Sequence, residues 1–202
     1  MTMRWYARVT LLILATLAAV PAPAEELPIA LAGPLILVDA DGKTVSTASF
    51  AGRWLLVYFG YTHCADWCPT SLSAMAEALD QIGPAAEHVQ PIFITVDPAR
   101  DHGPILRSFT AEYDKRLIGL GGSPGQIAAA ANALGVKYEK VLLGSDDYVI
   151  DHSATLSLID PSGRHAETFS MAEPYQIAAK LLAAVSSTGA SLDDVNNAAA
   201  YK

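Results

Sequence analysis

The chain has few cysteines, no excess of basic residues and a modest share of charge. Only two of its 202 residues are cysteine, which excludes a framework of several disulfides. Charged residues make up 17% and hydrophobic residues 51%, so the composition is that of a globular protein and not of a disordered one. The formal net charge is −8, which argues against nucleic acid as a partner because an acidic chain repels phosphates.

The N-terminal residues resemble an export signal. Arg4 and Arg8 precede a mainly apolar run, Val9–Val20, and Ala22–Ala24 fits the small-x-small pattern that comes before a cleavage point. The run is well short of the roughly 20 residues that span a bilayer as a helix, which favours a cleaved signal over the alternative, an uncleaved anchor in the inner membrane. We therefore expect residues 1–24 to be a signal peptide and the protein to be periplasmic.

Hydrophobic patterning predicts an α/β fold. Two apolar runs without alternation, Trp54–Phe59 and Val89–Val96, are typical of central strands covered on both faces. Strands alternate with helical patterns, which predicts a central, mostly parallel sheet flanked by helices, with an N-terminal β-hairpin and a late antiparallel hairpin. The predicted helices are 69–82, 104–113, 123–134 and 174–185, and the other strands are 34–39, 43–48, 117–120, 136–143, 155–159 and 164–169.

The length of the chain suits one domain with a sizeable hydrophobic core. After the signal peptide, we expect residues 25–33 to be an extended lead-in and residues 34–186 to form this single domain. Residues 187–202 are rich in Ser, Ala and Asn, and we expect them to be a flexible tail.

Cys64 and Cys68 form the candidate working site. They follow the central strand 54–59 and come at the start of the helix 69–82, where open α/β sheets usually bind ligands. A disulfide here would close a loop of only three residues, 65–67, and would add little stability. The helix N-terminus favours thiolates, which bind soft cations such as Cu(I) and also exchange disulfides. The spacing alone therefore leaves open a metal site and a redox dithiol.

Three blocks of the sequence resemble the signature of the SCO/SenC family of copper-binding proteins. They are Tyr58–Thr70 (YFGYTHCADWCPT), Thr95–Asp101 (TVDPARD) and Asp151–Ala154 (DHSA), in the order and at the intervals of the family. The resemblance covers roughly residues 34–184. One departure is Ala65, where many members have proline, and this change removes no ligand.

The resemblance implies a thioredoxin-like fold and a copper site, for Cu(I) and/or Cu(II), made of Cys64, Cys68 and His152. It also implies delivery of copper to the binuclear site of a cytochrome oxidase, through the copper-accepting subunit of that oxidase. A thiol reductant protein and another copper chaperone are further candidate partners. The alternative function is a thiol–disulfide oxidoreductase that keeps the cysteines of the acceptor reduced, with Cys64 and Cys68 as a catalytic redox dithiol. We expect a metallochaperone rather than an enzyme.

The neighbours of the two cysteines are expected to support the site. His63 should shape the loop and lower the thiol pKa, and Asp66 should interact with the helix dipole; each has direct metal binding as the alternative. Asp97, Arg100 and Asp101 should form a network in the loop near the site, with Asp101 also able to cap the helix that follows.

The aromatic residues Tyr58, Tyr61 and Trp67 should pack around the site and limit access of solvent.

Other functions fit less well. Oxidoreductases on the thioredoxin-like fold usually have two residues between their cysteines and a cis-proline facing them, whereas this chain has three residues and Ala154 at that place. The Pro-Thr-x-x-Cys motif of thiol peroxidases is absent. An interaction module with an inert disulfide is the remaining alternative, which thiol labelling with metal analysis would separate from the others.

The export signal leads to a first prediction about the exported protein. If residues 1–24 are removed on export, mass spectrometry of the protein expressed in a bacterial host will find Glu25 at the new N-terminus. Soluble cytoplasmic protein that keeps Met1 would contradict it.

Overall fold

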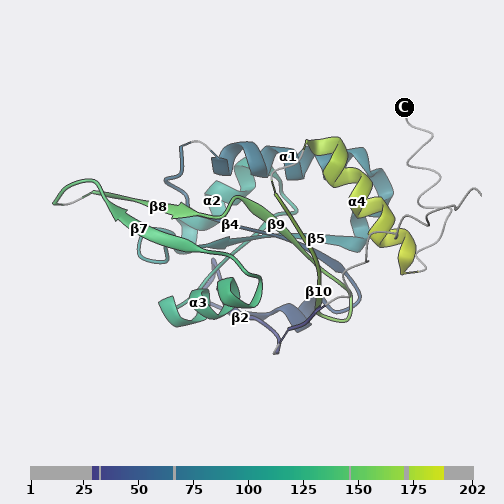
Figure 1. Cartoon of the computed structure of the whole chain (residues 1–202), viewed down its shortest axis with the longest axis horizontal. Helices are drawn as coiled ribbons and strands as arrows, with labels where there is room; N and C mark the ends of the chain where they lie inside the picture. The colour runs from purple at the N-terminus through teal and green to yellow at the C-terminus, as the bar shows by residue number, and fades with distance from the viewer. Residues whose placement is uncertain (1–28, 32, 66, 146, 171–172, 189–202) are drawn as a thin grey trace, which may run out of the picture.

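An eight-stranded sheet forms the centre of the protein in a computed structural model that describes residues 29–31, 33–65, 67–145, 147–170 and 173–188 (Figure 1). Its strands are β1 (Ile29–Ala30), β2 (Ile36–Asp39), β3 (Thr44–Ser46), β4 (Trp54–Gly60), β5 (Val89–Thr95), β6 (Ile118–Gly121), β9 (Thr155–Ile159) and β10 (Arg164–Ser170). Their order across the sheet is β1-β10-β9-β4-β5-β6-β2-β3. The central strands β4, β5 and β6 run parallel, and the outer strands are added antiparallel.

Helices cover both faces of this sheet (Figure 1). The helices are α1 (Trp67–Gln81), α2 (Gly103–Tyr113), α3 (Pro124–Ala133) and α4 (Pro174–Ser187), and two short 3₁₀ helices span Thr47–Phe50 and Gly83–His88. Buried side chains of α1, α2 and α4 share one core cluster, and those of α3 belong to a second cluster. Every residue of β4 and β5 is buried, which explains why these strands show no alternation of apolar and polar residues.

The sheet has the two antiparallel hairpins that the sequence predicts. β2 pairs with β3, and β9 pairs with β10, close to the expected boundaries. The four predicted helices also form, and α3 begins with a capping box in which Ser123 accepts from the Gln126 backbone N–H. The expected cap by Asp101 is wrong, because α2 has His102 at its N-cap and no side-chain cap there.

The hairpin made of β7 (Tyr138–Leu142) and β8 (Tyr148–His152) forms a separate two-stranded sheet. It extends away from the body of the protein, at the left of Figure 1. The sequence predicts β7 but no strand over 144–154, so β8 is an addition. Ile150 is the one buried residue of β8, which leaves the strand without the apolar alternation that identifies a strand from sequence.

Several expectations fall on residues that the structure does not describe. The signal peptide 1–24, Asp66 and residues 189–202 of the tail lie outside the described residues, and of the lead-in 25–33 only the end is described, where Ile29–Ala30 pairs with β10. Within the described ranges, no helix has the length and apolar character needed to cross a membrane.

The last residue of β4, Gly60, lies where side chains leave no room for a methyl group. A Cβ atom added to Gly60 would be 2.8 Å from Cys68 Sγ and 2.9 Å from a ring carbon of Phe93. Both side chains are fully buried and cannot move aside into solvent. A glycine at the end of this strand therefore makes space for the sulfur of Cys68.

This close approach predicts that Gly60→Ala destabilises the protein. Overpacking a tightly filled site should lower the free energy of unfolding of the reduced, metal-free protein by about 1–3 kcal/mol. The matched control is Gly144→Ala, because nothing lies within 4 Å of a Cβ added there, and its effect should stay within about 0.5 kcal/mol. Urea unfolding measures both variants, and equal midpoints for Gly60→Ala and the wild type would contradict the prediction.

Candidate metal centre

Three side chains that can bind metal meet at the carboxyl end of β4. Cys64 lies in the loop after this strand, Cys68 is in the first turn of α1, and His152 is the last residue of β8. Their ligand atoms all lie within 4.8 Å of one another, and Cys68 Sγ is 3.5 Å from His152 Nε2. Bonds from a metal ion to sulfur or to imidazole nitrogen are about 2.0–2.3 Å long, so the ligand atoms of a three-coordinate ion lie about 3.5–4 Å apart. Only small movements are needed for these three atoms to hold an ion.

This group is the one cluster of at least three His, Cys, Asp or Glu side chains with metal-site spacing in the part of the chain that the structure describes. His152 comes 84 residues after Cys68, so the fold brings the two together. His63 is not part of the cluster, although it precedes Cys64 directly. Its Nδ1 lies 3.0 Å from the hydroxyl of Thr62, and its side chain is 55% exposed.

The two thiols have different surroundings. Cys68 is fully buried and Cys64 is partly exposed, and no disulfide joins them. The pKa of Cys68 is raised by its hydrogen bond with Cys64 and by burial. The expectation of a lowered thiol pKa is therefore wrong for Cys68, because desolvation and the neighbouring sulfur outweigh the helix start. The helix start instead faces Cys64, since the Cys68 backbone N–H donates to Cys64 Sγ at 3.5 Å.

The imidazole of His152 presents its Nε2 to the sulfurs. Its Nδ1 lies 3.1 Å from the backbone oxygen of Ser153, and a carbonyl oxygen can only accept, so Nδ1 carries the proton of the neutral ring. Nε2 then keeps the free lone pair that a metal ligand requires. The rings of Tyr58 and Tyr61 meet the imidazole edge-on, with centroids 6.1 and 5.9 Å away, and limit its rotation.

The expected aromatic packing forms in part. Tyr58 and Tyr61 are buried beside the site, as the sequence predicts. Burial raises the pKa of Tyr58, so the phenol stays neutral. Trp67 differs from the expectation, since it is 58% exposed and lies open to solvent.

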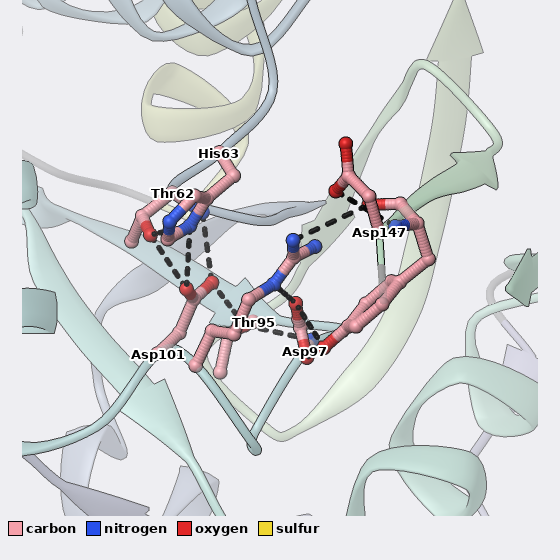
Figure 2. Close-up of polar contacts among 8 residues, drawn as sticks. Thr62, His63, Thr95, Asp97, Asp101 and Asp147 are labelled. Atoms are coloured by element: carbon pink, nitrogen blue, oxygen red, sulfur yellow. Dashed lines mark hydrogen bonds and ion pairs between the residues drawn. The ribbon is translucent and has the colours of Figure 1, made fainter. Parts of the chain in front are cut away.

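A buried carboxylate ties the loop with the cysteines to β5. Asp101, which is 1% exposed, accepts from the Thr62 backbone N–H at 2.8 Å, from the Thr62 hydroxyl at 2.6 Å and from the Thr95 hydroxyl at 2.7 Å. Figure 2 shows these contacts, with His63 at the edge of the group. Asp97 pairs with Arg100 and is linked to Asp101 through the Thr95 hydroxyl, so the predicted network exists. Asp101 binds the cysteine loop and caps no helix.

Gly60 is a residue of the site that the sequence analysis did not single out. It borders Cys68, as its close contacts show. A glycine at the end of an apolar strand, just before a pair of cysteines, could have indicated it, because such a glycine often marks a close approach.

Comparisons with known proteins identify the family. The family model described as SCO1/SenC matches residues 24–187. Protein SCO1 homolog 1, mitochondrial, from Arabidopsis thaliana is 40% identical over 133 residues, which are 65% of this chain and 40% of that protein, so the chain spans about two fifths of its length.

Solved structures agree with this assignment. ScoI of Bradyrhizobium japonicum with copper bound is 39% identical with a TM-score of 0.70, over 77% of this chain and 99% of that one. ScoI of Arabidopsis thaliana with copper bound is 33% identical with a TM-score of 0.73, over 78% and 99% of the two chains. The predicted thioredoxin-like α/β fold is confirmed by this likeness. On the extent of the family match and the shared fold, the chain belongs to the SCO1/SenC family.

Proposed function

We propose that the protein binds copper through Cys64, Cys68 and His152 outside the cytoplasm and delivers it to the binuclear copper site of a cytochrome oxidase. The observation that carries this proposal is the meeting of two sulfurs and one imidazole nitrogen within 4.8 Å of one another. Two members of the same family that share the fold have structures described as copper-bound, which supports copper as the metal.

The ligand set suits copper that has to be passed on. Thiolates are soft ligands that select Cu(I) over hard cations, and imidazole binds both Cu(I) and Cu(II). Three ligands leave a position free for a ligand from the acceptor, so transfer can proceed by exchange of ligands one at a time. Partial exposure of Cys64 places one sulfur where an acceptor can approach, while burial holds Cys68 in place.

The proposed location and the role of each segment follow from the sequence. Residues 1–24 would direct export to the periplasm and then be removed, residues 25–33 would lead into the domain, 34–186 would bind the metal, and 187–202 would form the tail. The partner would be the copper-accepting subunit of the oxidase, with a thiol reductant protein or another copper chaperone keeping the site reduced or loaded.

A second candidate function is reduction of the acceptor's cysteines by thiol–disulfide exchange. The observation in its favour is the partly exposed Cys64, whose sulfur accepts from the backbone N–H of Cys68 at a helix start. The burial of Cys68 disfavours it, because the second thiol must reach the mixed disulfide to resolve it. Copper binding is therefore the function that the site supports best.

The role of His152 gives a prediction for metal affinity. His152→Ala should weaken Cu(I) binding by about 10- to 100-fold through the loss of one ligand, measured by competition with a chromogenic chelator. It should leave disulfide formation between Cys64 and Cys68 intact, because that needs only the two sulfurs. The control is His102→Ala, an exposed histidine at the start of α2. Wild-type affinity in His152→Ala, together with loss of disulfide exchange, would favour the second candidate function.

The redox state of the cysteines should gate metal binding. Oxidation to a disulfide removes the negatively charged thiolates that bind a soft cation, so the oxidised protein should retain almost no Cu(I), and reduction should restore one equivalent. Anaerobic gel filtration followed by metal analysis and thiol counting measures both forms. Stoichiometric copper on the fully oxidised protein would refute the gate.

A further inference from the structure

The outer part of the hairpin that carries His152 is attached to the body of the protein by three side chains. Asp97 and Arg100 lie in the loop between β5 and α2, and Tyr148 is the first residue of β8. Arg100 donates from Nε to Asp97 and from Nη1 to the backbone oxygen of Tyr148 at 3.2 Å. The Tyr148 hydroxyl donates to Asp97 at 3.0 Å (Figure 2). We call this set the hairpin clamp.

The clamp also uses the face of the Tyr148 ring. The guanidinium carbon of Arg100 lies 3.8 Å from the ring centroid, and Lys140 Nζ of the neighbouring strand lies 3.5 Å from it. A planar guanidinium can stack on an aromatic ring while its edge donates to a carboxylate, which an ammonium cannot do. Arg100 thus joins Asp97 and Tyr148 through stacking and through hydrogen bonds at once.

Burial makes the clamp more than a surface ion pair. The side chain of Asp97 is 4% exposed and that of Arg100 is 23% exposed. A carboxylate in this position needs its partners, because a buried charge without them is costly. Asp97 is also fixed from its own side, since its backbone N–H donates to the hydroxyl of Thr95 at 2.9 Å. The clamp therefore has a rigid base in the loop after β5.

The strands of the hairpin pair with no strand of the large sheet, so side chains attach it to the body of the protein. Ile150 anchors the middle of β8 in the hydrophobic core, and the hairpin clamp holds the end of the strand that is far from His152. Near His152 the base of the hairpin is held by backbone bonding, as the Ser153 N–H donates to the Lys137 oxygen at 2.9 Å. Tyr148 lies at the other end of β8, about 13 Å away at 3.3 Å per residue. Rotation of the hairpin about its base would move the imidazole relative to the sulfurs.

We propose that Arg100 and Tyr148 are positioning residues for the metal centre, which orient the β7–β8 hairpin so that His152 Nε2 faces the sulfurs of Cys64 and Cys68. This inference rests on the proposed copper function. Neither residue is a ligand. If the clamp is removed, only a fraction of molecules has the imidazole in place, and the apparent affinity falls by that fraction. The loss is therefore bounded by the loss caused by removing His152 itself.

The test is a double-mutant cycle between the clamp and the histidine. Arg100→Ala and Tyr148→Leu should each weaken Cu(I) binding about 3- to 30-fold, and neither should have a further effect in the His152→Ala background. Arg100→Lys should recover only part of the loss, since lysine keeps the charge but lacks the planar guanidinium with its several N–H donors. The control is Arg107→Ala, because Arg107 pairs with Asp41 and does not contact the hairpin. Unchanged affinity in both clamp variants, or a loss that persists in full without His152, would overturn the proposal.

A measurement without metal separates this inference from the proposed function. In the reduced, metal-free protein, the NMR resonances of the His152 ring should shift or broaden in the clamp variants and stay unchanged in Arg107→Ala. Tyr148→Leu keeps the Asp97–Arg100 pair and carries the test if Arg100→Ala does not fold. If the wild type binds no copper, the proposed function fails, but the NMR comparison still tests whether the clamp positions His152. Altered His152 resonances in the clamp variants support the clamp, and unaltered resonances in both variants reject it.

Discussion

The contact between the sulfur of Cys68 and the imidazole of His152, 3.5 Å apart, is the constraint on which the rest of the site depends. One group is buried at the start of a helix, and the other is at the end of a strand outside the main sheet. Neither segment can place its side chain alone, so each needs contacts that fix its backbone. Gly60 gives the sulfur its space, and the Ser153 carbonyl sets the tautomer of the ring.

The loop between β5 and α2 holds both the cysteine loop and the β7–β8 hairpin. Because β4 and β5 are parallel neighbours, their carboxyl ends meet at the same edge of the sheet, and the Val96 N–H donates to the Gly60 oxygen there. From the loop after β5, Asp101 holds the cysteine loop through Thr62, and Arg100 holds the hairpin through Tyr148. The block TVDPARD thus links the two halves of the site without providing a ligand.

The sequence predicts the central strands and the position of the cysteines, because apolar runs and a strand-to-helix loop are local patterns. It identifies His152 only through the family resemblance, since no local pattern relates residues 84 apart. Strand β8 escapes prediction because Ile150 is its only buried residue, and the role of Tyr148 escapes prediction with it. The raised pKa of Cys68 also could not be foreseen, because it follows from burial and from the proximity of Cys64 in three dimensions.

The most direct test of the account is X-ray absorption at the copper edge on the reduced protein loaded anaerobically with one equivalent of Cu(I). The account predicts two sulfur scatterers and one imidazole nitrogen at bonding distance from the copper of the wild type. It predicts loss of the imidazole signal in His152→Ala with both sulfurs retained. A wild-type spectrum without imidazole, or an imidazole signal that survives in the variant, would contradict the central claim.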